Sequence, residues 1–354
     1  MKIVIVGCGI AGFTAAKNLR EKLPSSEITL VDGGFGVRVP DAQGNLLETS
    51  VYTRLKGEKA RLERAEKQRQ LYVAMTRAEQ KLILASPEAI EKSGIQFLAG
   101  VEAVSIQVQQ KTLTLADARV LPYDRLVLAP GAEPSIPPIE GAGTDMTLRS
   151  LEDVQRYSRL LKEGERATVI GGGLLGLEAA HALRERGLKV AVAEFMPRLL
   201  PRQLSEKESE ILQKKFEELG YEIFTGRAPK TLTRTDSGWI LRLEDGTEIP
   251  SSIVLISAGI RSRTALAKAA GATGERGIVV NNRLETSLPD VYAIGDCAQL
   301  GGVVYGLWLA SKDQGTALAE ILAGTRETFI SPVYEPSLKI PGIKLKEIRM
   351  AAQG

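Results

Sequence analysis

The chain has 354 residues, of which 44% are hydrophobic and 25% charged, and its formal net charge is +3. This length supports two or three domains with cores of their own, and the composition excludes a globally disordered chain. The small net charge gives no bulk attraction to nucleic acid or to an anionic membrane, and no apolar run reaches the roughly 18 to 20 residues of a membrane span. Because MKIVIVGCGIAG lacks the features of a signal peptide, we expect a cytoplasmic protein.

The first predicted element is a buried strand at residues 2–6, KIVIV, a short apolar run rich in β-branched side chains. The stretch GCGIAG follows directly and opens a helical pattern. In such a loop the first glycine permits the turn, the second admits a pyrophosphate to the backbone, and the third lets helix and strand pack closely. Asp32 ends the next apolar run, where a carboxylate can bind a ribose hydroxyl. The candidate dinucleotide-binding residues of the loop are Gly7, Gly9, Ile10, Ala11 and Gly12.

Residues 35–86 differ from the rest of the chain. Residues 56–77 are charged and rich in Ala and Leu, which predicts a helix, and the run LILAS after them predicts a strand. The stretch QRQLYVAMTRAEQKLILAS resembles the sixth-motif region of UvrD-like helicases of the AddA type, in which Arg77 would contact a γ-phosphate. A helicase function does not follow, because the chain has no GxxxxGK[ST] phosphate loop. We expect the stretch to fill the place of a crossover connection.

A second copy of the strand, glycine loop, helix and acid plan begins at ATVIGGGLLGLE. One such loop is weak evidence, but two complete copies favour dinucleotide binding over merely structural turns. Glu194 ends the following strand, where it disfavours a 2′-phosphate and favours NADH over NADPH, although Arg198 nearby keeps NADPH open. The candidate residues of this loop are Gly171, Gly173, Leu174, Leu175 and Gly176.

Each copy is followed by a β-rich stretch, and the second contains a predicted tight turn at Asp245–Gly246. Each stretch ends in a buried strand that runs into a glycine, either Gly131, which follows Pro130, or Gly259. These three residues are further candidates for cofactor binding. The repetition predicts an internal duplication. The expected fold is α/β, with two Rossmann-like dinucleotide-binding domains, each three-layered with a parallel sheet and a β-meander.

The two cysteines, Cys8 and Cys297, lie far apart and show no CxxC or metal-ligand spacing. This excludes a disulfide framework and a redox pair adjacent in sequence, and no metal site is expected. We interpret Cys8 as a small apolar filler of the first loop. The single histidine, His181, falls within a predicted helix, where a partly exposed helix residue outweighs catalysis.

Together with the stretch ETSLPDVYAIGDCAQL, these motifs resemble the pyridine nucleotide-disulfide oxidoreductase family of FAD- and NAD(P)H-dependent flavoproteins. The likeness is greatest to the branch of NADH:rubredoxin reductases and nitrite reductase components, and it covers residues 1–33 and about 88–345. It implies that the first loop binds FAD and the second NADH, and that the NAD domain interrupts the FAD domain. The implied boundaries are 1–143 and 264–325 for the FAD domain, 144–263 for the NAD(P)H domain, and 326–354 for a truncated C-terminal segment.

The resemblance also implies roles for single residues. Gly295 and Asp296 would contact the ribityl and pyrophosphate part of FAD. Glu178 would lie near the nicotinamide, although it also suits the first helical turn through the macrodipole. The stretch VVYGLWLASKDQG makes Trp308 and Gly306 candidate flavin neighbours, against a plain core role for Trp308. Pro130 stands in LAPG where the family has ATG, which removes a backbone donor near the cofactor.

The predicted function is that of an FAD-dependent oxidoreductase that passes a hydride from NADH to FAD. The electrons would continue to a rubredoxin-like protein, a quinone-like compound or dioxygen. One alternative is a non-catalytic chimera that binds nucleotide but has lost FAD, because residues 35–86 replace the family's own segment. Another, a nucleic-acid-associated protein, rests on the helicase-like stretch alone. We expect no membrane or nucleic-acid partner, and a homodimer is one option.

Overall fold

The computed structural model describes residues 1–353 apart from 8, 33–37, 41–45, 49–92 and 336. The helix and strand predicted between residues 56 and 86 and the residue Cys8 lie outside the described residues. The chain forms two compact units. The first contains the described parts of residues 1–52, 83–133 and 260–334, and the second contains residues 134–259 and the described parts of 335–354.

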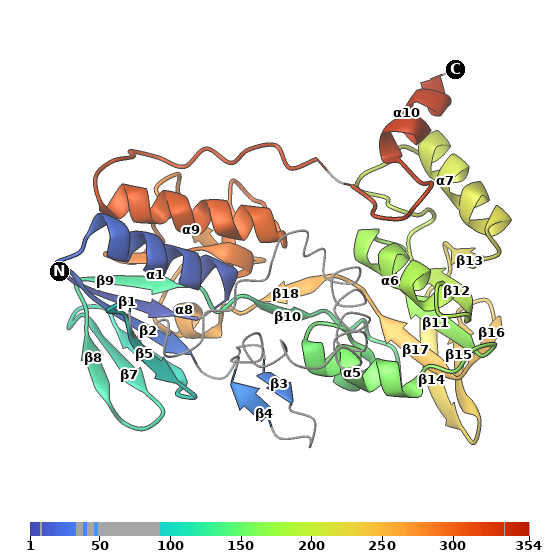
Figure 1. Cartoon of the computed structure of the whole chain (residues 1–354), viewed down its shortest axis with the longest axis horizontal. Coiled ribbons are helices and arrows are strands. Elements are labelled where there is room, and N and C mark those ends of the chain that lie inside the picture. Colours follow the sequence, from blue (N-terminus) through green and yellow to red (C-terminus); the bar gives the residue numbers. More distant parts are fainter. Residues whose placement is uncertain (8, 33–37, 41–45, 49–92, 336, 354) are drawn as a thin grey trace, which may run out of the picture. The chain divides into compact units, whose positions relative to one another are not determined.

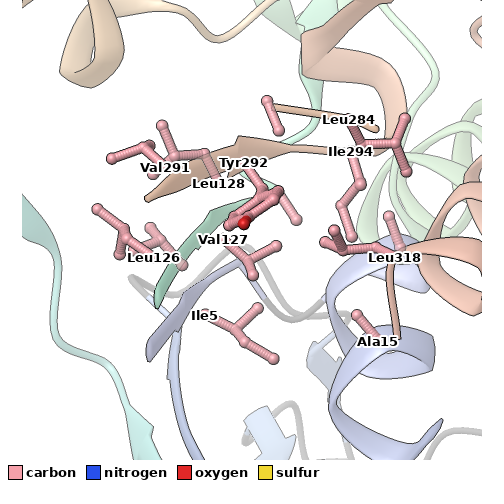
Figure 2. Packing of buried hydrophobic residues seen from close by; sticks show 14 of the residues in the cluster. Ile5, Ala15, Leu126, Val127, Leu128, Leu284, Val291, Tyr292, Ile294 and Leu318 are labelled. Carbon is pink, nitrogen blue, oxygen red and sulfur yellow. The ribbon is translucent and has the colours of Figure 1, made fainter. Parts of the chain in front are cut away.

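A parallel five-stranded sheet is the centre of the first unit, with strand order β20-β9-β1-β2-β5. Its central strands are almost wholly buried runs of Val, Ile and Leu, as parallel strands covered on both faces require. Figure 2 shows Leu126, Val127 and Leu128 of β9 between Ile5 of β1 and Tyr292 of β20. The strands are β1 (Lys2–Val6), β2 (Glu27–Asp32), β5 (Gln96–Ala99), β9 (Arg125–Leu128) and β20 (Val291–Ala293).

Two helices, α1 (Ile10–Lys22) and α9 (Trp308–Leu322), lie side by side in the first unit, although they come from opposite ends of the chain (Figure 1). Gly315 permits this approach, because a Cβ there would lie 2.7 Å from the carbonyl oxygen of Ala11. Ala15 of α1 and Leu318 of α9 are fully buried in the core (Figure 2). The carboxyl-terminal part of the unit is thereby packed directly on the helix that follows the first glycine loop.

Shorter elements complete the first unit. Strands β6, β7 and β8 form an antiparallel meander, and the pairs β19 with β21, β10 with β18, and β3 with β4 are two-stranded. Their bounds are β3 (Arg38–Pro40), β4 (Leu46–Glu48), β6 (Ala103–Gln107), β7 (Thr112–Leu115), β8 (Val120–Pro122), β10 (Ala132–Pro134), β18 (Ile260–Ser262), α8 (Ala265–Ala269), β19 (Ile278–Val280), η3 (Gly295–Cys297) and β21 (Ala298–Leu300).

The second unit repeats this plan around a parallel sheet with strand order β13-β12-β11-β17 and an antiparallel meander β14-β15-β16. The predicted turn is confirmed, since Gly246 has φ +86° and the backbone N–H of Thr247 donates to Asp245 Oδ1 at 2.9 Å. The elements are η2 (Thr144–Met146), α5 (Leu151–Leu160), β11 (Arg166–Ile170), α6 (Leu174–Arg184), β12 (Lys189–Glu194), α7 (Glu206–Glu218), β13 (Glu222–Thr225), β14 (Pro229–Thr235), β15 (Gly238–Leu243), β16 (Glu248–Ser251), β17 (Ile253–Ile256) and α10 (Leu345–Gln353).

The predicted α/β fold with an internal duplication is confirmed. The order β5-β2-β1-β9 of the first sheet matches the order β13-β12-β11-β17 of the second, and each sheet has its own three-stranded meander. Within the residues described, no helix has both the length and the apolar character needed to cross a membrane. The duplicated plan places one glycine loop at the carboxyl end of the central strand of each unit.

Candidate dinucleotide-binding sites

The first glycine loop begins where β1 ends and is held by its neighbouring strands. The N–H of Gly7 donates to the carbonyl of Val31 at 2.8 Å, and the N–H of Ala129 donates to that of Val6 at 2.7 Å. Gly7 has φ +105°, and a Cβ there would overlap the carbonyl of Ala129, so only glycine fits. Backbone hydrogen bonds to the neighbouring chain segments therefore hold the turn on both sides.

The second loop has the same geometry. The N–H of Gly171 donates to the carbonyl of Ala193 at 2.8 Å, and the N–H of Ser257 donates to that of Ile170 at 2.8 Å. Gly171 has φ +121°, and a Cβ there would overlap the carbonyl of Ser257. The agreement in both hydrogen bonds and the clash shows that the two loops are structural repeats.

The second and third glycines of each loop differ in what surrounds them. A Cβ at Gly12 or at Gly176 would overlap the carbonyl oxygen of the first glycine of its loop, so these two positions bring helix and turn into contact. A Cβ at Gly9 or Gly173 would meet nothing within 4 Å. The second glycine thus faces open space, which is the space a pyrophosphate needs.

The helices that follow the glycine loops begin differently from α5 and α7. Helices α5 and α7 begin with capping boxes, Ser150 with Asp153 and Ser205 with Glu208. Helices α1 and α6 instead have glycine N-caps, Gly9 and Gly173, with no side-chain cap hydrogen bond and no acid in the first turn. Their first N–H groups have no partner inside the helix, so both amino ends can bind an anion.

The two predicted acids end β2 and β12 beside their loops. Asp32 is buried and Glu194 is half-buried. Both carboxylate oxygens of Glu194 accept backbone hydrogen bonds, from Gly172 at 2.5 Å and from Met196 at 2.7 Å. These bonds fix the carboxylate against the loop and leave each oxygen a further lone pair for a ribose hydroxyl.

The region around Arg198 bears on the choice between the two nicotinamide coenzymes. Its guanidinium lies 3.3 Å from Glu206 and donates to the carbonyl of Pro201 at 3.5 Å. Arg198 is therefore engaged away from Glu194, and the fixed acid at the ribose position repels a 2′-phosphate. Both observations favour NADH.

The turn at Gly295 and Asp296 is positioned by three side chains that were not identified from the sequence. Buried Gln314 accepts the N–H of Gly295 at 2.6 Å, and Ser311 donates to Asp296 Oδ1 at 3.3 Å. Ser262 donates to the carbonyl of Asp296 at 2.7 Å. A Cβ at Gly295 would lie 2.8 Å from that of Ala11, so the turn packs against the first turn of α1. Asp296 therefore lies beside the first glycine loop.

Other predicted residues of the first unit lie near this site. Trp308 begins α9 and is half-buried, with the ammonium of Lys312 5.7 Å from its ring centroid, so it is not plain core. A Cβ at Gly306 would lie 2.9 Å from Ile260. The carbonyl of Pro130 accepts from Arg263 at 3.3 Å, and Gly131 has φ +71°. Gly259, the equivalent glycine of the second unit, has φ +91°.

Three ionisable residues, Cys297, His181 and Glu178, are buried or half-buried. Burial raises the pKa of the Cys297 thiol to about 12, and the thiol donates to the carbonyls of Ile294 and Leu128. His181 Nδ1 lies 3.2 Å from the Tyr221 hydroxyl, and burial lowers the pKa of His181. Glu178 is 1% exposed and accepts the N–H of Lys339 at 3.0 Å. No metal-binding group of His, Cys, Asp and Glu occurs among the residues that the structure describes.

Comparison with known proteins places these sites in context. The family model of the pyridine nucleotide-disulphide oxidoreductases matches residues 1–315. The chain is 34% identical over 259 residues to the nitrite reductase (NADH) large subunit of Escherichia coli, covering 72% of this chain and 31% of that protein. It is 32% identical over 345 residues to the rubredoxin-NAD(+) reductase of Alcanivorax borkumensis, covering 96% of this chain and 83% of that protein.

A solved structure agrees with the sequence matches. A chain in the crystal structure of the covalent putidaredoxin reductase-putidaredoxin complex superposes with a TM-score of 0.75 at 28% identity, covering 91% of this chain and 75% of that chain. The chain spans about a third of the length of the nitrite reductase relatives that it matches.

Proposed function

Because the chain belongs to the pyridine nucleotide-disulphide oxidoreductase family, we propose that it transfers a hydride from NADH to FAD and passes the electrons to a small redox protein. The family and the rubredoxin-NAD(+) reductase relative support the enzyme class predicted from the sequence, an FAD-dependent NAD(P)H oxidoreductase. When bound, FAD accepts a hydride from a nicotinamide ring and releases the electrons to an acceptor.

In this proposal the first unit binds FAD. The open space at Gly9 and the uncapped amino end of α1 accept the pyrophosphate, and Asp32 accepts a ribose hydroxyl. Asp296, fixed by Ser311, orients the ribityl chain. The donor set fits the group, since it combines a glycine turn, free helix N–H groups and two acids.

The second unit binds NADH by the same means. Gly173 and the amino end of α6 accept the pyrophosphate, and Glu194 binds the adenosine ribose. The single observation that carries the assignment is the repetition of one cradle in two units, because transfer between two dinucleotides requires a site for each. Glu194, held by Gly172 and Met196, then selects NADH over NADPH.

The electron acceptor is inferred from the absence of a thiol pair in the sequence and from the relatives of the chain. The chain has two cysteines, and Cys297 is buried with a raised pKa, so no adjacent thiol pair takes electrons from the flavin. Two relatives are named for small redox proteins, rubredoxin and putidaredoxin. We therefore place a protein of that size and type as acceptor, with dioxygen or a quinone-like compound as the alternatives to be separated by experiment.

The test is a visible spectrum of the purified chain after addition of FAD, followed by NADH oxidation assays with rubredoxin, a soluble quinone or air as acceptor. We expect a yellow protein and faster turnover with rubredoxin than with air alone. A protein that remains colourless after FAD is added and excess FAD is removed would establish the alternative, a nucleotide-binding protein without flavin.

A further inference from the structure

Trp308 is the first residue of α9, and the chain enters this helix without a side-chain cap. The N-cap residue, Leu307, has no polar side chain to bond the first N–H groups, and the first turn contains no acid. The loop before the helix turns at Gly306, which has φ +60°. A cap helps to fix the angle at which a chain enters a helix. The orientation of Trp308 therefore depends on contacts made outside the helix end.

The segment that follows α9 supplies such contacts. This return segment, defined here as residues 326–334, runs back along α9 within the first unit (Figure 1). At its start, Arg326 pairs with Glu320 of α9 at 2.8 Å. At its end, the Tyr334 hydroxyl donates to Asp313 Oδ2 of α9 at 2.9 Å. The return segment is thus tied to the helix at both of its ends.

Tyr334 makes a second contact, with the loop that leads into α9. Its ring meets that of Tyr305 edge-on, with ring centroids 5.5 Å apart and an interplanar angle of 75°, an arrangement that aromatic pairs favour. Burial and the Asp313 carboxylate raise the pKa of the Tyr334 hydroxyl, so the hydroxyl stays protonated at neutral pH and keeps donating. These two contacts, the clamp, join Tyr305 before the helix to Asp313 within it.

We propose that Tyr334 is a positioning residue, which clamps the loop before α9 to the helix and thereby orients Trp308 in the proposed flavin site. Tyr305 lies three residues before Trp308 and Asp313 lies five residues after it, so the clamp spans the uncapped start of the helix. A side chain beside a reactive ring has to be held by locked neighbours if the ring is to be oriented. The inference rests on the proposed function for the identity of the ligand, whereas the clamp consists of contacts within the chain.

Acrylamide quenching of Trp308 fluorescence in the full chain, without added flavin, tests the clamp. The chain has two tryptophans, so Trp239→Phe leaves Trp308 as the only one. In this background Tyr334→Phe keeps the ring and removes the hydroxyl. It should raise the quenching constant of Trp308 by about twofold or more, because loss of a hydrogen bond to a charged acceptor favours local opening. Val333→Ala is the matched control, since Val333 is 91% exposed on the same segment.

Variants of the acceptor test whether the hydrogen bond is responsible. Asp313→Ala should match Tyr334→Phe, whereas Asp313→Asn keeps an oxygen acceptor and should restore the parent value. Adding Asp313→Ala to Tyr334→Phe should give no further increase, because both substitutions remove the same bond. The proposal is overturned if the quenching constant in Tyr334→Phe equals that of the parent, or if Val333→Ala raises it equally.

A fluorescence titration with FAD separates this inference from the proposed function. We expect Tyr334→Phe to raise the FAD dissociation constant severalfold and Val333→Ala to leave it unchanged. Faster quenching of Trp308 with an unaltered FAD affinity would overturn the proposal, since the clamp would then orient a residue away from the flavin. Failure of the parent chain to bind FAD would instead refute the proposed function, and the quenching results would still decide whether the clamp exists.

Discussion

At the scale of single residues, substitution can distinguish the role of the second glycine of each loop from that of the third. Gly173 has φ −77° and nothing within 4 Å of its Cβ position, so alanine fits the protein but fills the space proposed for the pyrophosphate. Gly176→Ala instead places a Cβ against the carbonyl of Gly171. The first change should affect binding and the second should affect folding.

Calorimetric titration with NADH and thermal denaturation measure these two effects. We expect Gly173→Ala to weaken NADH binding about tenfold or more, which is ~1.4 kcal/mol, with an unchanged melting temperature of the nucleotide-free protein. Gly176→Ala should destabilise the protein by about 1–3 kcal/mol. An unaltered NADH affinity in Gly173→Ala would show that the pyrophosphate lies elsewhere.

Glu194 tests the coenzyme preference. Glu194→Ala removes the ribose acceptor and the repulsion of a 2′-phosphate, so the ratio of NADPH to NADH affinity should rise by about tenfold. Glu222→Ala is a matched control, because that acid pairs with Arg166 at the start of β11. Equal loss of affinity for both coenzymes in Glu194→Ala would assign Glu194 to holding the loop and not to selecting the coenzyme.

Pro130 can be compared with Ala258, which takes the equivalent place beside the second glycine loop. The nitrogen of Pro130 lies 3.0 Å from the Cβ position of Gly7, and the nitrogen of Ala258 lies 3.5 Å from that of Gly171. The second loop therefore has an N–H where the first has none. Pro130→Ala should tighten FAD binding severalfold in a fluorescence titration, since one hydrogen bond contributes about 0.5–1.5 kcal/mol. Weaker FAD binding in this variant would show that the proline ring itself packs on the cofactor.

At the scale of elements, the capping box that begins α7 contrasts with the glycine N-caps of α1 and α6. Ser205→Ala removes the cap of α7 and should lower stability by about 1 kcal/mol, seen as a lower melting temperature, with NADH affinity unchanged. Lys214→Ala, an exposed change within the same helix, should alter stability much less. A similar loss in both variants would show that the cap contributes nothing special.

The same scale shows what could be predicted from the sequence. The Asp245–Gly246 turn, the glycine-loop turns at Gly7 and Gly171, and the strands and meanders outside residues 35–86 follow from local patterns, and the structure confirms them. The side chains that position Asp296 were missed, because their contacts join segments distant in sequence. Ser311 and Gln314 share one face of α9 at a spacing of three residues, a signal that only gains meaning once α9 is known to pack on α1.

At the scale of the whole molecule, the chain contains one module twice, with strand order, loop hydrogen bonds and glycine clashes repeated in both units. The sequence resemblance assigns FAD to the first copy and NADH to the second, and this assignment stays a proposal. The helicase-like stretch covers residues 35–86, and nearly all of these positions lie outside the described residues. The crossover predicted there therefore stays a prediction. The proposed hydride transfer requires both copies to hold their cofactors at once.

Stopped-flow mixing of the FAD-loaded protein with NADH or NADPH, without oxygen, tests the proposed hydride transfer most directly. We predict that NADH bleaches the flavin absorbance fully within a single exponential phase and faster than NADPH does. Bound flavin that stays oxidised at saturating NADH, or that is reduced faster by NADPH, would contradict the account.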